Sequence, residues 1–419
     1  NEGHAALSLL ERIGARGGAN GATEAAVRDR TLFTLHTPVP AGNEIFGAEF
    51  VARSLELAVP AIATERALDL GRSRNGGDAF DLGAMAIRLA ATTNGVSQRH
   101  ASVVNADWGD LVGGKAVGVT NGVHPQTWIG SAMARILRRT FGPDWPARTI
   151  SPEGWDALYD VRDADLWNAH TTQKQHMLRD IRSRLMDQYA RHGMSPDELR
   201  RVRDYLPDER LTIAFARRFA TYKRANLLFS DPARLRRLLT DPERPVQIVF
   251  AGKAHPADRE GQALIRWVGE MSRAPDLAGH IFFVENYDLA LGASLVQGAD
   301  VWLNHPRPPR EASGTSGMKA AGNGGLNLSV LDGWWLEGFN GKNGWGFGEH
   351  ETSDPEDAAT LYHLLESEVV PLFYDREDGV PRGWVRMMKE AMASVIPRFS
   401  AHRMALEYTE RFYLPLGGG

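Results

Sequence analysis

The stretch Leu211-Thr212-Ile213-Ala214-Phe215-Ala216 has the character of a buried β-strand, because it is short and almost entirely apolar. Further apolar runs of this kind follow at residues 246–251, 281–284, 301–303 and 326–331. Segments with helical character lie between them, most clearly at 258–271 and 289–297. Alternating strands and helices predict parallel strands with right-handed crossovers, and therefore a doubly wound α/β lobe.

The loop that follows this first strand concentrates positive charge. Sheets of this type bind ligands beyond the carboxyl ends of their strands, so the loops after residues 216, 251, 284 and 303 should line one crevice. Arg217, Arg218, Lys223 and Arg224 occur in the first loop with no acidic residue among them. Such cations can bind phosphate through paired hydrogen bonds. A solvated basic turn explains the segment equally well, and the cluster alone leaves both interpretations open.

The rest of the chain indicates a second lobe. A length of 419 residues exceeds what one hydrophobic core usually organises. Apolar runs at 30–35 and 115–119 lie among helical segments, so the first part is mixed α and β. A charged stretch with two prolines at 195–209 puts the boundary near Tyr205. We therefore predict lobes at 1–205 and 206–390, and a helical segment at 391–419 that packs back on the first lobe.

Composition and charge argue against several classes of function. A net charge of −4 gives no general attraction to nucleic acid or to an anionic membrane. The chain has no Cys, which excludes disulfides, thiolate metal sites and cysteine nucleophiles. It has no apolar run near the ~20 residues that cross a bilayer, and no signal sequence is visible. We expect a cytoplasmic protein without a metal ion and, because residue 1 is not Met, a fragment of a longer chain.

A glycine-rich turn precedes a predicted helix near Met318. Gly314 and Gly317 surround Thr315 and Ser316, so backbone amides and hydroxyls can form a cradle for phosphate. Lys319, at the start of that helix, can reach a carbonyl carbon beside the same phosphate, as an aldehyde cofactor requires. Without its surroundings, the turn is more often a helix cap with a surface lysine.

The longer pattern around Lys319 resembles the cofactor segment of the α-glucan phosphorylases. Residues 311–319 read Glu-Ala-Ser-Gly-Thr-Ser-Gly-Met-Lys and are followed by Asn323-Gly324 and Leu331-Asp332-Gly333. Other segments resemble the family in the same order along nearly the whole chain: 1–4, 36–42, 94–96 with His100, 120–123, 222–224, 252–254 and 285–287.

The resemblance implies an architecture of two facing Rossmann-like lobes of the GT-B glycosyltransferase type. Glucan and phosphate would lie between the lobes, with pyridoxal 5′-phosphate buried against the second. Residues 217–224 and 36–42 are similar to a shorter bacterial and archaeal branch, although Arg217 and Gly317 stand where lysine and asparagine are usual in animal and plant enzymes. A family loop that contacts substrate phosphate would precede Asn1, so the first lobe is expected to be incomplete and this chain alone could be inactive.

The resemblance also implies roles for the cofactor residues. Lys319 would form a Schiff base with pyridoxal phosphate. Arg217, Thr315 and Ser316 would hold the cofactor phosphate, and Tyr287 would line the cofactor.

For the substrates, Arg218 and Lys223 would bind inorganic phosphate. The terminal glucose would be held by His100, Asn121, Glu311, Ala312, Ser313 and Gly314. The His100 main chain would steady positive charge on the sugar, which makes Arg218, Lys223, His100 and Lys319 the expected catalytic set. Tyr287 and His100 as core residues, and Asn121 as a turn residue, are the structural alternatives.

The implied reaction is reversible phosphorolysis of the terminal α-1,4 bond of a glucan, releasing glucose 1-phosphate with retained configuration. Two alternatives stay open: a nucleotide-sugar-dependent glucosyltransferase, suggested by residues 337–341 and 343–346, and a noncatalytic glucan-binding fragment. No Walker loop, His-Glu-x-x-His pair or dinucleotide fingerprint occurs, so neither a metal nor NAD is indicated. Assembly into a homo-oligomer is left open.

Overall fold

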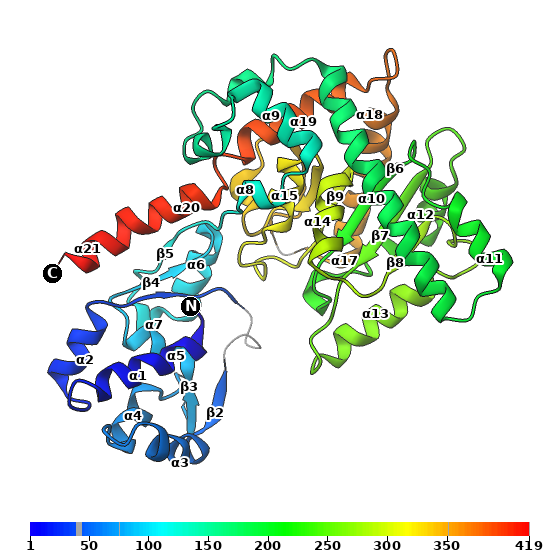
Figure 1. The fold of residues 1–419 in the computed structure, drawn as a ribbon. Helices are drawn as coiled ribbons and strands as arrows, with labels where there is room; N and C mark the ends of the chain where they lie inside the picture. Colours follow the sequence, from blue (N-terminus) through cyan, green and yellow to red (C-terminus); the bar gives the residue numbers. More distant parts are fainter. Residues whose placement is uncertain (39–43, 75, 351, 419) are drawn as a thin grey trace.

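The computed structural model describes residues 1–38, 44–74, 76–350 and 352–418. Within these ranges the chain forms two α/β bodies, each built on a parallel sheet (Figure 1). The blue and cyan body holds the start of the chain, with a hydrophobic cluster that extends from Ala6 to Ala116, and the green, yellow and orange body holds most of the remainder. The motif at 36–42 falls partly outside the described residues.

The second body is organised by a six-stranded parallel sheet with the order β11-β10-β9-β6-β7-β8. Its strands are β6 (Leu211–Ala216), β7 (Val246–Ala251), β8 (Ile281–Val284), β9 (Val301–Asn304), β10 (Leu326–Val330) and β11 (Gly344–Phe347). The doubly wound sheet expected from the five apolar runs is therefore confirmed, with bounds that differ by one residue at most. Strand β11 was not predicted, because its alternating glycines do not look like a strand until Asn327–Val330 supply a partner.

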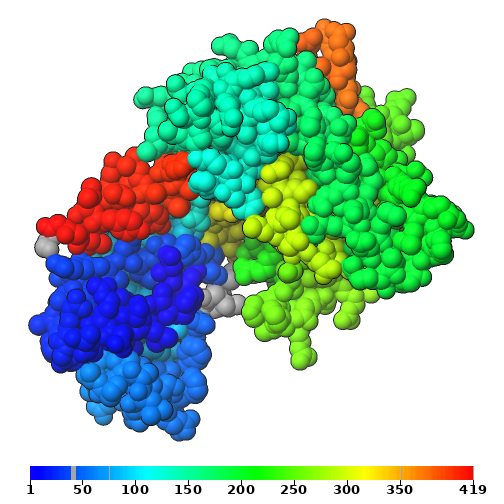
Figure 2. Space-filling view, viewed as in Figure 1, coloured from blue at the N-terminus to red at the C-terminus, as the bar shows by residue number. Residues whose placement is uncertain are grey.

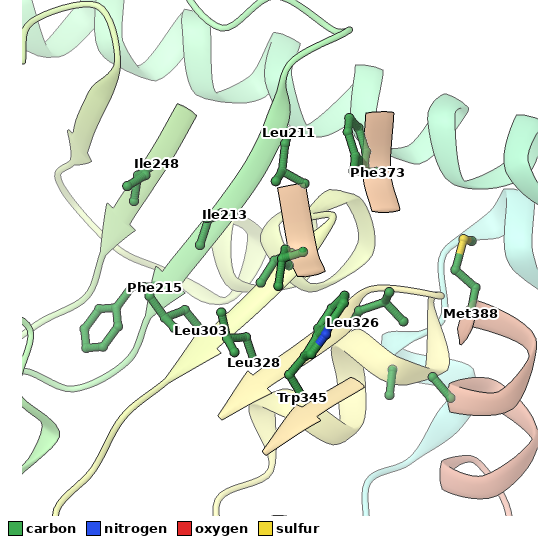
Figure 3. Packing of buried hydrophobic residues seen from close by; sticks show 14 of the residues in the cluster. Leu211, Ile213, Phe215, Ile248, Leu303, Leu326, Leu328, Trp345, Phe373 and Met388 are labelled. Atoms are coloured by element: carbon green, nitrogen blue, oxygen red, sulfur yellow. The ribbon is translucent and has the colours of Figure 1, made fainter. Parts of the chain in front are cut away.

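The sheet separates two hydrophobic clusters. Leu211, Ile213 and Phe215 of β6 face one cluster, whereas Ala214 and Ala216 face the other, as the two-residue period of a strand requires. Figure 3 shows the first cluster, where Leu211, Ile213 and Phe215 follow β6 beside Leu303, Leu326, Leu328 and Trp345 of the neighbouring strands. Burial on both faces explains why these strands are almost continuously apolar.

Helices cover both faces of this sheet. Those between the strands include α12 (Pro232–Thr240), α13 (Arg259–Met271), α14 (Leu289–Gly298), α15 (Ser316–Gly322) and α16 (Trp335–Gly338). The helices predicted at 258–271 and 289–297 are confirmed as α13 and α14. After β11 come α17 (Asp354–Leu364), α18 (Val370–Tyr374) and α19 (Arg382–Val395).

Residues between the two sheets pack with the second body. The helices here are α8 (Pro125–Trp128), α9 (Ser131–Phe141), α10 (Asp163–Arg191) and α11 (Pro196–Arg201). Met133 and Ile136 of α9 belong to one cluster of the six-stranded sheet, and Met177 and Ile181 of α10 to the other. The packing boundary therefore lies near residue 123, which differs from the boundary near Tyr205 expected from composition.

The first body contains a three-stranded parallel sheet with the order β1-β4-β5. Its strands are β1 (Leu32–Thr34), β4 (Thr92–Gly95) and β5 (Val117–Gly118), and β2 (Ile45–Gly47) pairs antiparallel with β3 (Ala79–Asp81). Around them lie α1 (Leu7–Gly14), α2 (Gly21–Arg28), α3 (Ala48–Ala58), α4 (Thr64–Leu70), α5 (Leu82–Arg88), α6 (Gln98–Asp107) and α7 (Gly109–Val112).

In the described part of the chain, the segment that leaves the first body near Val123 pairs with the segment that returns to it near Ala401. Val123 donates its amide to Phe399 O at 2.8 Å and accepts from Ala401 N at 2.7 Å. Beyond this point α20 (Ala401–Tyr408) and α21 (Leu414–Gly417), red in Figure 1, run along the first body. There Asn94 Nδ2 donates to Tyr408 Oη at 2.8 Å, so the C-terminal helices join the two bodies.

No helix of the described part of the chain combines the length and apolarity that a membrane crossing needs.

Candidate functional site

A cleft of about 940 Å³ lies where the loops after β6, β7 and β9 meet the first body. Thr37, Pro38, Val103 and Asp107 line it on one side. On the other side it is lined by Arg218, Ala220, Thr221, Tyr222, His255, Ala257, Asp258, Pro309 and Arg310. Figure 2 shows a hollow between the blue body and the green one. The carboxyl edge of the sheet therefore forms one wall of an interbody cleft, as doubly wound sheets favour.

Two cations of the loop after β6 converge on one carboxylate. Arg217 Nη2 lies 2.6 Å from Glu311 Oε2, and Lys223 Nζ lies 3.1 Å from the same oxygen. Burial opposes ionisation of Glu311, but the charges of Arg217 and Lys223 outweigh it and lower the pKa of the carboxyl to about 2. Burial and the neighbouring Arg217 lower the pKa of Lys223 to about 8. The loop after β6, with Arg217 and Lys223, and the loop after β9, with Glu311, thus bring buried charged side chains into contact.

The positive charge at this point is only partly compensated. Arg217 is 8% exposed on its side chain, and its Nε and Nη1 atoms are buried without a hydrogen-bond partner. A buried donor without a partner costs about 1 to 3 kcal/mol, so a site of this kind favours a bound anion. Arg218 is exposed and lines the cleft, where its side chain hydrogen-bonds to that of Tyr222. The structure therefore brings Arg217, Lys223 and Glu311 together and places Arg218 apart from them, on the surface of the cleft.

The glycine-rich turn leads directly into α15. Gly314 has φ +73°, a left-handed conformation that favours glycine, and Thr315 is the residue before the helix. Ser316 Oγ accepts from Trp302 Nε1 at 3.0 Å. At Gly317 a Cβ atom would meet Asn327 Oδ1 at 2.3 Å and the Trp334 ring at 2.9 Å. A side chain at Gly317 would therefore displace Asn327 and Trp334, and this is a position where the sequence departs from the animal and plant pattern.

Lys319 lies in α15 with its amine against an aromatic ring. Its Nζ is 3.6 Å from the centroid of the Trp128 ring, and no carboxylate in the described ranges pairs with it. Burial lowers the pKa of this amine. An aldehyde group reacts with an unprotonated amine, so an unpaired and half-buried lysine beside a phosphate cradle fits pyridoxal phosphate. Tyr287 contacts the start of α14, where a Cβ on Gly292 would meet its hydroxyl at 2.6 Å.

The loop 311–314 is held by both bodies. Asp332 Oδ2 accepts from Glu311 N at 2.9 Å, and Ser313 O accepts from Trp334 N at 2.9 Å. From the first body, Ser97 Oγ donates to Ala312 O at 2.5 Å. The loop expected to hold the sugar therefore lies at the junction of the two bodies.

His100 and Asn121 lie in the first body near this junction. Asn121 N donates to Val96 O at 3.0 Å. The His100 ring accepts from Val96 N at 3.2 Å, and its Nε2 is buried without a partner. Burial, and to a lesser extent His36, lower the pKa of His100 to about 4. His100 lies in the first turn of α6, where its amide donates to Ser97 Oγ at 3.0 Å, and its main-chain role stays a prediction.

Three features of the site were missed in the sequence. Trp128 covers Lys319, and its only signal was its place in a short segment that begins at Pro125. Asp332, whose pKa is raised to about 7 by burial, orients Glu311 although it was noted only as part of a motif. Thr37 lines the cleft beside the carboxyl end of β1, next to His36. Within the described ranges, no three His, Cys, Asp or Glu side chains gather closely enough to hold a metal.

Comparisons with known proteins identify the family. The family model described as carbohydrate phosphorylase matches residues 64–348. The chain is 41% identical to a maltodextrin phosphorylase of Thermococcus litoralis over 99% of its own length and 50% of the relative. It is 41% identical to a glycogen phosphorylase of Aquifex aeolicus (92% and 57%), and 38% identical to one of Mycobacterium tuberculosis (99% and 50%).

The chain thus spans about half the length of the curated relatives it matches. The family match includes the loop after β6, the segment 311–319 and α15, where the buried cations and Lys319 lie. The chain belongs to the carbohydrate phosphorylase family.

Proposed function

We propose that this chain provides the cofactor and phosphate side of an α-glucan phosphorylase, which cleaves terminal α-1,4 bonds with phosphate and releases glucose 1-phosphate with retained configuration. The observation that carries the proposal is that Arg217 and Lys223 both form ion pairs with Glu311, while two donor atoms of Arg217 stay buried without partners. These residues lie at the carboxyl edge of the sheet, where α15 with Lys319 also begins. The arrangement of two facing lobes of the GT-B type is part of the same proposal, as is a cytoplasmic location.

Pyridoxal phosphate is the cofactor we propose, with Lys319 as its attachment point. Thr315, Ser316 and Arg217 would hold its phosphate, and Tyr287 would line it. When bound, the cofactor supplies a phosphate group that assists proton transfer at the substrate phosphate. In this site the lysine serves as an anchor, and no protein carboxylate acts as a nucleophile.

The protein's own residues account for binding and charge. Arg218 and Lys223 would bind the substrate phosphate, and with a pKa of about 8 Lys223 is mostly protonated at neutral pH. Glu311 is ionised at that pH because its pKa is about 2, so its carboxylate can accept a hydrogen bond from a sugar hydroxyl. Asn121 and the loop 311–314 would complete the sugar site. Closure of the cleft would keep water from the sugar cation.

The glucosyltransferase alternative rested on residues 337–341 and 343–346. In the structure, Glu337 accepts from Gln98 N at 2.9 Å and from Thr120 Oγ1 at 2.7 Å. Its carboxylate therefore joins the two bodies, which gives the alternative no specific support.

Borohydride reduction in the presence of pyridoxal phosphate, followed by peptide mapping, tests the proposal. We expect the reduced cofactor on Lys319, no labelling after Lys319→Arg, and unchanged labelling in the control Lys253→Arg. Release of glucose 1-phosphate from maltoheptaose and phosphate is then measured in the full-length protein. A folded protein that is never labelled at Lys319 would refute the proposed cofactor role and favour the glucosyltransferase.

A further inference from the structure

Arg224 is the cation of the β6 loop to which the proposed function gives no role. It is 2% exposed. Its Nε donates to His305 O at 2.7 Å and its Nη2 to Pro306 O at 2.9 Å. Its Nη1 donates to Asp354 Oδ1 at 3.0 Å and to Asp357 Oδ2 at 2.6 Å. One guanidinium group thus ties the loop after β6 to the segment after β9 and to the start of α17.

The chemistry of this contact requires arginine. The two carboxylates and two carbonyls surround a planar group with donors in fixed directions, and a lysine ammonium cannot reach all four. Asp357 is 2% exposed, so its charge depends on Arg224 for compensation. Asp354 is more exposed and is shared with Arg307, whose Nη2 lies 2.7 Å away. The interaction is therefore a buried anchor and not a surface ion pair.

This anchor determines how the backbone turns after Lys223. The short helical turn η6 (Thr221–Lys223) ends at Arg224, which has φ +51° in the left-handed region. A residue other than glycine holds that conformation only where its surroundings impose it. The side-chain contacts of Arg224 supply such a constraint and fix the direction in which Lys223 leaves the loop.

The same anchor fixes the segment that carries Glu311. Its carbonyl partners, His305 and Pro306, begin the stretch that ends at Glu311, and Arg307 N donates to Tyr222 O at 2.8 Å beside Lys223. Lys223 and Glu311, 88 residues apart in the chain, then meet at 3.1 Å. Both partners of this ion pair are held by segments that Arg224 joins.

We propose that Arg224 is a positioning residue: its buried contacts hold Lys223 and Glu311 in the arrangement that binds the substrate phosphate. It does not contact the phosphate itself. This inference rests on the proposed function only in taking Lys223 as a phosphate ligand.

Calorimetric titration of inorganic phosphate tests this in the protein supplied with pyridoxal phosphate. The variants are Lys223→Ala, Arg224→Lys and the double variant. We expect Arg224→Lys to weaken phosphate binding about tenfold, the effect of roughly one lost hydrogen bond to a charged group. Because Arg224 acts through Lys223, the double variant should bind phosphate no more weakly than Lys223→Ala alone. Losses that multiply in the double variant would overturn the proposal.

Two further variants distinguish a specific effect on phosphate binding from a general effect on folding. Asp354→Asn leaves Asp357 in place and should weaken phosphate binding two- to fivefold, again with no added loss in a Lys223→Ala background. Arg234→Lys is the matched control, since Arg234 makes a two-bond pair with Glu366 away from this loop, and its phosphate affinity should stay unchanged.

The outcomes separate this inference from the proposed function. If Arg224→Lys and Asp354→Asn bind phosphate as tightly as the wild-type protein does, only the positioning role is overturned. Wild-type protein that binds no phosphate would overturn both the positioning role and the phosphate site. Absence of label on Lys319, with the phosphate titrations as expected, would refute the cofactor proposal and leave the positioning role intact.

Discussion

Two buried charge clusters lie at opposite ends of the same sheet, and only one of them, the unsaturated cluster around Glu311, contains an arginine with two donor atoms that lack partners. At the start of β6 and β9, Asp300 accepts from His170 Nε2 at 2.9 Å, Lys174 Nζ at 2.5 Å and Thr212 N at 2.8 Å. Lys174 also donates to Arg210 O at 2.7 Å. Every Asp300 oxygen thus has a partner, so we call this the saturated cluster, although His170 Nδ1 is buried without a partner. Burial opposes ionisation of Asp300, but the charge of Lys174 and the His170 hydrogen bond lower its pKa.

The cluster at the carboxyl end of the sheet differs because it keeps hydrogen-bond donors that have no partner. Glu311 shares one carboxylate between two cations, and Arg217 keeps two buried donors without partners. Both clusters thus combine a buried carboxylate with basic side chains, but they differ in the hydrogen-bonding capacity that is left over. A saturated cluster stabilises the fold by joining α10 to the sheet, whereas an unsaturated one is suited to receive an anion.

The largest expected effect comes from breaking the saturated cluster. Asp300→Ala leaves Lys174 and His170 buried without their carboxylate, and removing one partner of a buried pair costs about 3–5 kcal/mol. Denaturant unfolding measures this loss. Arg139→Ala is the control, because Arg139 pairs with Asp165 at the surface and should change stability by less than about 1 kcal/mol. Similar losses in both variants would contradict the structural role of the Asp300 cluster.

At the unsaturated cluster, Glu311→Gln should act mainly on ligands. The charge of Glu311 raises the pKa of Lys223, so the variant should move that pKa below about 8. Sugar binding should weaken by about 2 kcal/mol, through loss of a charged hydrogen bond. Calorimetry with maltoheptaose and NMR titration of the lysine side chain measure the two effects. An unchanged Lys223 pKa would show that the contact is absent in solution.

The buried ring of His100 gives a smaller effect that depends on pH. Its folded pKa of about 4 lies below the ordinary value of 6.5, so the unfolded chain binds more protons between these values. Stability is therefore lost as the pH falls below about 6.5, by about 2 kcal/mol at pH 5. His100→Gln should flatten the stability profile over this range. A profile with the same slope in the variant would assign the acid sensitivity to another group.

The smallest effect concerns the helix that presents Lys319. Gly317→Ala places a methyl group against Asn327 and Trp334, which should cost at least about 1 kcal/mol and lower cofactor occupancy. Gly269→Ala is the matched control in α13, where the added methyl group meets nothing within 4 Å and should stabilise the protein by about 0.5–1 kcal/mol. Thermal melts with and without pyridoxal phosphate compare the two.

The regular part of the fold could be predicted because its signals are local. Apolar runs with the composition of buried strands gave β6 to β10 within one residue, and helical periodicity gave α13 and α14. Strand β11 was missed because glycines weaken a local strand signal. Residues 129–191 were assigned to the first lobe, since nothing in their own sequence tells which sheet their apolar faces cover.

By itself the sequence determined the parallel sheet, the glycine-rich turn before α15 and the presence of cations after β6, since each depends on residues close together in the chain. Only the tertiary structure decided that Arg217 meets Glu311, that Trp128 covers Lys319 and that Arg224 is an anchor. These contacts join residues about 80 to 190 positions apart, and which partner a charged or aromatic side chain finds is decided by packing of whole elements.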